Sequence, residues 1–145
     1  MRLCRFRHQN ESHVGLYDEQ QIVPLRAAAA AFTRAKGETL WLHDSDNLLD
    51  FLPPHGAGFE NCCRLAAWAG RAPAALQGVS LPTASVQLLV PIPTPNAMFL
   101  LAGNYADHIR EGGGIAAERA ETFPYVFMKP PTTTLTDPGK PIRIP

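Results

Sequence analysis

The sequence lacks the features that mark several broad classes of protein. Its 145 residues carry 13 basic and 13 acidic side chains, so the formal charge is zero at pH 7. No excess of positive charge points to nucleic acid or to an anionic membrane surface. No apolar run reaches about 18 residues, the length typical of a transmembrane helix, and the N-terminal segment MRLCRFRHQN becomes polar too early for a signal peptide. We therefore expect a cytoplasmic protein that binds neither nucleic acid nor membranes.

Cysteine is scarce, and its positions form no recognisable metal or disulfide pattern. The three cysteines are Cys4, Cys62 and Cys63. Their number is odd, two are adjacent, and no Cys-x-x-Cys or Cys/His spacing is typical of zinc. Free thiols in a reducing compartment are the simplest explanation. Because free cysteine packs as a small hydrophobic residue, we expect all three to be packing residues.

Proline is unevenly distributed along the chain. Nine of the 14 prolines lie in the last 55 residues. Proline fixes φ and has no backbone N–H to donate, so this region is predicted to contain loops and strands rather than helices. The remaining composition, with 46% hydrophobic and 18% charged residues, is typical of a soluble globular chain.

The first part of the chain has the pattern of a small α+β domain over residues 1–80. Three apolar clusters within residues 1–25, separated by polar turns, predict three short antiparallel strands. The alanine-rich residues 26–36 predict a helix that Gly37 ends. Residues 58–70 predict a second, amphipathic helix.

Two finer predictions concern the helices of this domain. A short helix is expected before the Pro53-Pro54 pair, with Asp44 or Asp46 as its N-cap. The apolar stripe of the helix over residues 58–70 is predicted to consist of Phe59, Cys63, Ala66 and Gly70.

A second domain is predicted to begin near residue 81. Apolar runs over residues 86–90 and 98–102 predict strands, and the proline-spaced connector between them is expected to be extended. Polar side chains then gather just after the second strand, where many α/β-type sites place their chemistry. These residues, which follow a break at Gly103, are Asn104, Tyr105, Asp107, His108 and Glu111.

The spacing of His108 and Glu111 is compatible with acid–base chemistry. If a helix starts near Tyr105, these two residues lie three apart on one face. An imidazole beside a carboxylate can activate a water molecule, but the same spacing is common on ordinary surface helices. Asp107 is expected either to cap the helix or to pair with Arg110.

Two neighbouring features also have alternative explanations. The glycines at residues 112–114 predict either a closing lid or an ordinary flexible loop. Lys129 ends a second apolar run, and it either projects into a pocket as an anion anchor or lies in water at a strand end.

Taken together, two segments resemble the fumarylacetoacetate hydrolase family. They are GNYADHIRE, residues 103–111, and FPYVFMKPPTTTLTDPGKPIRIP, residues 123–145. The N-terminal segments MRLCRFR and VGLYDEQQIVPL resemble the small accessory domain of many bacterial members. The resemblance implies a small α+β domain over residues 1–80, followed at 81–145 by the N-terminal part of a mainly β, mixed-sheet catalytic domain.

The resemblance also implies an activity. Members of the family are usually homodimeric enzymes that use Mg²⁺ or Mn²⁺ to act on 2-oxo or β-dicarbonyl acids. They hydrolyse C–C bonds in acylpyruvates and fumarylacetoacetate, or decarboxylate or isomerise related acids. By resemblance, His108 and Glu111 orient and deprotonate the attacking water, and Asn104, Tyr105 and Lys129 contribute to the substrate cavity. The metal would polarise the oxygens of the substrate.

The metal ligands implied by the resemblance are a Glu-x-Glu pair and a later aspartate, but the sequence contains no Glu-x-Glu. We therefore expect no metal site in this chain, and an inactive protein when the chain is isolated. It would be the N-terminal half of an enzyme: a truncated gene product, an engineered fragment, or one half of a split enzyme. A rival interpretation is a non-catalytic module that docks a partner chain through residues 98–103 and 142–144. An unrelated small α+β domain is a third.

Overall fold

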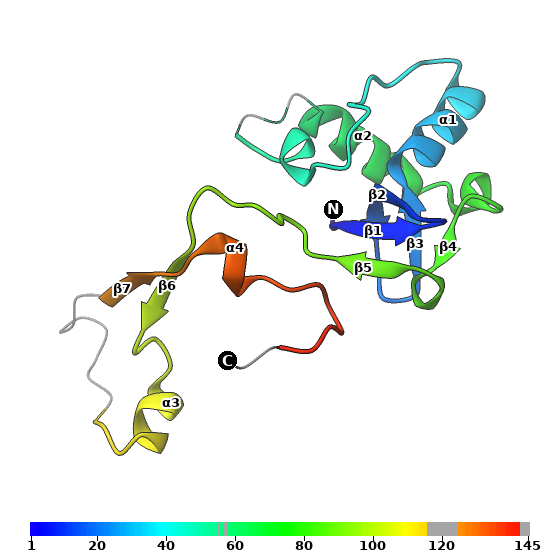
Figure 1. The fold of residues 1–145 in the computed structure, drawn as a ribbon. Coiled ribbons are helices and arrows are strands. Elements are labelled where there is room, and N and C mark those ends of the chain that lie inside the picture. Colours follow the sequence, from blue (N-terminus) through cyan, green and yellow to red (C-terminus); the bar gives the residue numbers. More distant parts are fainter. Residues whose placement is uncertain (55, 57, 116–124, 143–145) are drawn as a thin grey trace. The chain divides into compact units, whose positions relative to one another are not determined.

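A computed structural model describes residues 1–54, 56, 58–115 and 125–142. The chain forms two compact units (Figure 1). The first contains Met1–Ile92 with Thr136–Pro145, and the second contains Pro93–Leu135. Both units combine helices with antiparallel strands, so the α+β class is confirmed, while the mixed sheet of a catalytic domain stays a prediction. Among the described residues, no helix is both long and apolar enough to cross a membrane.

A five-stranded antiparallel sheet forms the centre of the first unit, in the order β4-β3-β2-β1-β5. The strands are β1 Leu3–His8, β2 Glu11–Tyr17, β3 Gln21–Pro24, β4 Leu81–Pro82 and β5 Gln87–Leu89. The three strands predicted within residues 1–25 are confirmed. Gln9 and Asn10 link β1 to β2 at φ values of 51° and 67°, the backbone that a two-residue hairpin turn requires.

Both predicted helices of the first unit are confirmed, as α1 Leu25–Lys36 and α2 Phe59–Ala69. Gly37 ends α1 in the left-handed conformation, at φ 69°, and its N–H donates to the Thr33 carbonyl oxygen. Glycine adopts this conformation without the steric cost that other residues meet. Three short 3₁₀ segments complete the unit: η1 Leu48–Phe51, η2 Pro73–Leu76 and η3 Thr83–Ser85.

The predicted N-cap of the short helix before Pro53 was wrong. Asn47 is the N-cap of η1, and its Oδ1 accepts the Leu49 N–H at 3.2 Å. The two aspartates bind arginines instead. Asp46 accepts Arg5 Nη2 at 2.6 Å, and Asp44 pairs with Arg26. Sequence spacing does not reveal these pairs, because each arginine is distant in sequence from its aspartate.

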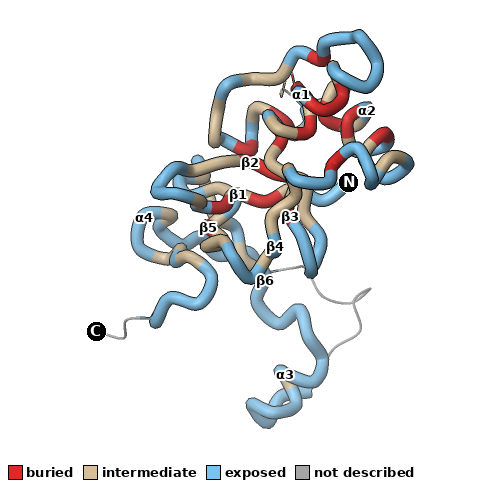
Figure 2. Tube along the Cα trace, turned by 90° about the vertical axis from the view of Figure 1, so that its right-hand side faces the viewer, coloured by how far each residue is buried: buried red, intermediate tan, exposed pale blue. Residues whose placement is uncertain are grey.

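The main core lies between one face of the sheet and the helices α1 and α2 (Figure 2). The buried residues of α2 are Cys62, Leu65 and Trp68, so the predicted stripe was wrong by one position. The rotation follows the large side chains, since Leu65 and Trp68 bury far more apolar area than alanine or glycine. The Trp68 ring meets the Phe32 ring edge-on, with centroids 5.3 Å apart.

β5 joins the first unit because it pairs with β1. Leu89 lies opposite Arg5 and is only 4% exposed. The Val90 N–H donates to Asp137 Oδ1 at 2.8 Å, which ties the segment around Asp137 to the same unit. The compact unit therefore reaches Ile92, beyond the domain boundary predicted near residue 80. The assignment of residues 81–145 to a catalytic domain stays a prediction.

The second unit contains a two-stranded antiparallel sheet and two short helices. These are β6 Phe99–Ala102, α3 Ala106–Glu111, β7 Tyr125–Met128 and α4 Pro131–Thr134. The strand predicted over residues 98–102 is confirmed, but the expectation from proline content that the last 55 residues lack helices was wrong. Pro131 occupies the first turn of α4, where a missing N–H has little effect.

Of the predicted docking edge at 142–144, Ile142 is not in a strand, and residues 143–144 lie outside the described part.

Gly15 lies against both β1 and β3, where no side chain fits without movement. A Cβ built there would lie 2.7 Å from Ile22 Cγ2 and 3.0 Å from Phe6 Cε1. We expect Gly15→Ala to lower the free energy of unfolding by about 1–3 kcal/mol, because overpacking displaces buried neighbours. Urea denaturation measures the change. Gly70→Ala is the matched control, since its Cβ would meet only carbonyl oxygens, the nearest at 3.7 Å from that of Ala66. Equal losses in the two variants would contradict the close contact at Gly15.

Candidate functional site

The predicted site residues all lie in the second unit, close to the ends of β6 and β7. After β6 the chain turns at Gly103, where φ is 65°. Asn104 and Tyr105 connect this turn to α3, and Tyr105 is the N-cap residue of the helix, although its side chain makes no capping bond. Both side chains are exposed. The helix therefore begins where the sequence predicts it.

α3 brings His108 and Glu111 together. Nδ1 of His108 lies 3.7 Å from Oε2 of Glu111, as residues three apart on a helix allow. This distance suits an ion pair when the imidazole is protonated, but it exceeds that of a hydrogen bond. The two side chains are 81% and 78% exposed. The predicted juxtaposition is present, but it lies in open solvent.

Asp107 pairs with Arg110, as one of the two alternatives predicted. Arg110 Nη1 donates to Asp107 Oδ1 at 2.8 Å, and no side chain caps the N-terminus of α3. Both partners are largely exposed, so the pair adds little to stability. It does occupy the carboxylate of Asp107, which leaves Glu111 as the carboxylate beside the imidazole.

Lys129 lies at the opposite end of the two-stranded sheet from α3. Tyr125 of β7 pairs with Ala102, the last residue of β6, whereas the Lys129 N–H donates to the Met98 carbonyl oxygen before β6 begins. The length of β6 separates these ends by about 10 Å at roughly 3.3 Å per residue. Lys129 is also exposed. The structure therefore does not bring Lys129 to the histidine–glutamate pair, and a cavity shared by these residues stays a prediction.

The sheet beside the site buries none of its described residues. Leu100 is half-buried. The other large apolar side chains are exposed, at 68% for Phe99, 52% for Leu101, 76% for Tyr125, 54% for Val126, 43% for Phe127 and 64% for Met128. Alternate residues of a strand point to opposite faces, so both faces of this sheet are apolar. A two-stranded sheet is marginal in water without further packing. Within the described residues of the second unit, both faces of β6 and β7 are therefore left without covering side chains.

The described residues do not fit the metal that the resemblance implies. In residues 1–54, 56, 58–115 and 125–142, no group of three or more His, Cys, Asp or Glu side chains comes together. A hard cation such as Mg²⁺ prefers a cluster of oxygen ligands. The two carboxylates of α3 already face Arg110 and His108. This part of the chain therefore does not offer the set of oxygen ligands that such a cation needs.

The cysteines are confirmed as free thiols. Cys4 and Cys62 are buried, and Cys63 is half-buried. Burial disfavours the charged thiolate, and it raises the pKa of both Cys4 and Cys62 to about 11. The first two cysteines are therefore packing residues, as predicted, and each is a poor nucleophile in the folded protein.

The raised pKa of these thiols predicts their reactivity. At pH 8 we expect iodoacetamide to modify Cys63 first, and Cys4 and Cys62 only on unfolding, as mass spectrometry of timed samples would reveal. Equal labelling of all three in the folded chain would contradict their burial. Because the folded pKa exceeds the unfolded one, the thiols stabilise the fold below pH 9 and lose that contribution as pH rises to about 11.

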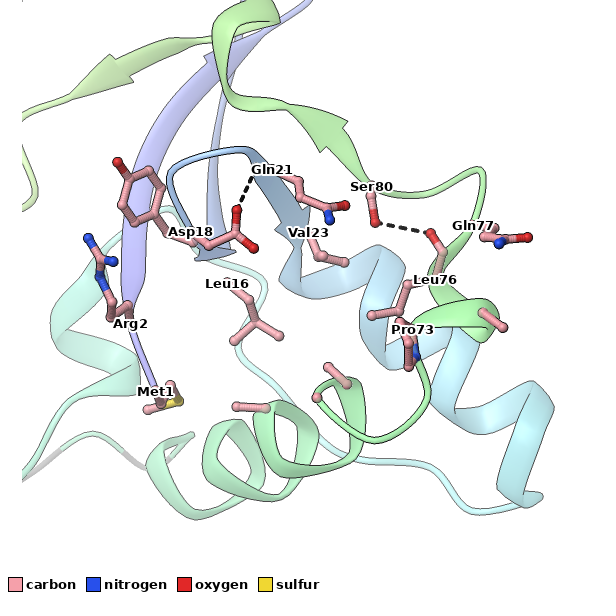
Figure 3. Close-up of a pocket in the computed structure, with 15 residues that line it drawn as sticks. Met1, Arg2, Leu16, Asp18, Gln21, Val23, Pro73, Leu76, Gln77 and Ser80 are labelled. Carbon is pink, nitrogen blue, oxygen red and sulfur yellow. Dashed lines mark hydrogen bonds between the residues drawn. The ribbon is translucent and has the colours of Figure 1, made fainter.

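Sequence reasoning found none of the hollows in the first unit. One of about 710 Å³ lies between the sheet, α2 and η2 (Figure 3). Its walls come from segments far apart in sequence, such as Leu16, Ala69 and Leu76. None of these residues belongs to a chemical motif, so no sequence signal marks the hollow.

The N-terminal part of this unit has known relatives. Residues 1–49 match the family described as Rv2993c-like, N-terminal. Protein Rv2993c of Mycobacterium tuberculosis (strain ATCC 25618 / H37Rv) is 43% identical over 68 residues. That alignment covers 47% of this chain and 23% of the relative, so the chain matches less than a quarter of that protein's length. The first three strands and α1 are therefore similar to an Rv2993c-like N-terminal domain.

Proposed function

We propose that the second unit is the first part of a catalytic domain of the fumarylacetoacetate hydrolase type. The proposed reaction is metal-dependent hydrolysis of a C–C bond in a 2-oxo or β-dicarbonyl acid, such as an acylpyruvate. Decarboxylation or isomerisation of related acids belongs to the same family chemistry. The observation that supports this most is the 3.7 Å approach of His108 and Glu111 on α3, within the segment GNYADHIRE that carries the resemblance.

The chemistry assigned to this pair is the activation of water. Nδ1 of His108 faces Glu111, and a hydrogen bond there would leave Nε2 as the acceptor that takes a proton from the attacking water. Enclosure would have to shorten the 3.7 Å separation to hydrogen-bond distance. Asn104 and Tyr105, which precede the helix, are proposed to contact the substrate.

The proposal requires additional polypeptide for two reasons. It must cover the exposed apolar faces of β6 and β7, and it must supply the ligands for Mg²⁺ or Mn²⁺. A later part of the same polypeptide or a separate partner chain could do both. Homodimerisation of the complete enzyme remains a prediction.

An assay with acetylpyruvate and Mn²⁺ tests this function. The 145-residue chain alone is expected to show no turnover. A polypeptide that supplies the downstream half, including a Glu-x-Glu segment, is expected to restore hydrolysis when it is fused or mixed with this chain. A completed protein that neither hydrolyses, decarboxylates nor isomerises any of a panel of 2-oxo acids would contradict the proposal.

A non-catalytic docking module is the second candidate, and the exposed apolar sheet favours it. Strands with free edges can pair with a partner strand. Leu101→Lys with Phe127→Lys is expected to abolish association with a downstream half, because each places a charge in an apolar interface. Size-exclusion chromatography measures the association. The control is the double variant Ala30→Lys with Ala35→Lys, which adds the same charge at exposed positions of α1 in the first unit. A stable complex without turnover would favour the module over the enzyme.

A further inference from the structure

The two units are joined by two segments of the chain, and these segments are fastened to each other at both ends. We propose that residues 90–98 and 129–137 form a two-armed linker, and that the Asp137 side chain is a latch that opens and closes its end in the first unit. Figure 1 shows the two arms, one between β5 and β6 and the other running from β7 through α4. The inference goes beyond the proposed function and does not depend on it, since it concerns only how the chain leaves and re-enters the first unit.

The end of the linker in the second unit is closed by the backbone. The Lys129 N–H donates to the Met98 carbonyl oxygen at 3.2 Å. Next to this bond, Met128 of β7 lies opposite Phe99 of β6, so the bond continues the antiparallel pairing of the two strands. Both arms therefore start from neighbouring residues of one sheet.

The end of the linker in the first unit is closed at Val90, which two side chains hold. Asp137 Oδ1 accepts the Val90 N–H at 2.8 Å, and Arg5 Nη1 donates to the Val90 carbonyl oxygen at 3.2 Å. Arg5 is itself fixed, because it donates to the carbonyl oxygen of Asp46 at 2.8 Å and to its Oδ2 at 2.6 Å. Its side chain is only 14% exposed. Arg5 therefore holds the first arm to the sheet, and Asp137 fastens the second arm to the first.

The contact made by Asp137 is the one that can be released. Asp137 is half-buried, but Thr136 and residues 138–142 are exposed, so little packing supports its hydrogen bond. Because β6 and β7 already pair, the loop that the latch closes consists of the two arms alone. The entropic cost of closing such a loop opposes the gain from a single charge-assisted hydrogen bond. The two effects are of similar size, so both the closed and the open state are accessible.

Proline stiffens both arms. Proline-rich linkers act as semi-rigid spacers, because proline fixes its own φ and restricts the residue before it. The prolines of the first arm are Pro91, Pro93 and Pro95, and those of the second arm are Pro130 and Pro131. Two stiff arms that are fastened at both ends resist twisting that a single arm permits. The state of the latch therefore decides how freely the second unit turns on the first.

Asp137→Ala in the ¹⁵N-labelled 145-residue chain tests the latch by NMR. We expect the Val90 amide hydrogen to exchange with solvent at least about tenfold faster, because its acceptor is removed. The ¹H–¹⁵N NOE should fall at Thr136 on the second arm and also at Asn96 on the first, since release of one arm frees the other. Asp107→Ala makes the same substitution in α3 and should change none of these values. An unchanged Val90 exchange rate, or an unchanged NOE at Asn96, would overturn the proposal.

Two further variants keep the test decisive if Asp137→Ala fails to fold. Asp137→Asn keeps an acceptor oxygen but loses the charge, so the Val90 amide should exchange at a rate between those of the parent and Asp137→Ala. Asp137 also begins a turn in which the Lys140 N–H donates to its carbonyl oxygen at 3.1 Å and Gly139 has a φ of 76°. Gly139→Ala strains this turn and should loosen the latch, whereas Gly113→Ala, at φ 77° in the second unit, is the matched control. Parental Val90 exchange in both Asp137→Asn and Gly139→Ala would overturn the latch.

Discussion

Replacing Phe6 with alanine is expected to lower the free energy of unfolding of the first unit by about 3–5 kcal/mol. Phe6 is fully buried in the middle of β1. It packs with Cys4 and Ile22 on the sheet face opposite the main core, and its ring lies 5.4 Å from that of His13. The variant would lose the transfer free energy of the ring and leave a cavity between β1 and β3.

Phe99→Ala is the matched control for this measurement. It removes the same side chain from a strand, but Phe99 is 68% exposed in the second unit. We expect its effect on the first unit to remain within about 0.5 kcal/mol. Urea denaturation followed by far-UV circular dichroism compares the two variants. A Phe6→Ala variant as stable as Phe99→Ala would contradict the buried packing of Phe6 against Cys4 and Ile22. A total stability of roughly 5–15 kcal/mol is typical of a domain, so the loss at Phe6 could unfold the chain.

His108→Ala should have the largest effect on activity. In an active enzyme that contains this chain, we expect it to lower kcat by about 10²–10⁴-fold, the usual contribution of a positioned general base. Affinity for Mn²⁺ should stay nearly unchanged, because the proposal assigns His108 to water and not to the metal. Steady-state kinetics and a metal titration of the same variant measure the two quantities separately.

Asp107→Ala is the control for this variant, since Asp107 lies on the same helix and pairs with Arg110. It should retain turnover, whereas Glu111→Ala should lose part of it by releasing the imidazole. Retained hydrolysis in His108→Ala would exclude water activation by this residue. A loss of Mn²⁺ binding in parallel with turnover would instead indicate that His108 is a ligand.

The sequence by itself determined the local elements of the first unit. Alternating apolar clusters predicted β1, β2 and β3, and the alanine-rich run with Gly37 predicted α1, because these patterns act over a few residues. The same holds for α3, where the spacing of His108 and Glu111 brings them together on one helix turn.

The tertiary structure decided the features that depend on residues distant in sequence. The pairing of β5 with β1 extends the first unit to Ile92. The register of β6 with β7 separates Lys129 from α3, and the burial of Leu65 and Trp68 sets the rotation of α2. Register and burial are properties of contacts between segments, and no pattern within one segment contains them. The exposure of the histidine–glutamate pair was decided in the same way, by how little of the described chain packs around it.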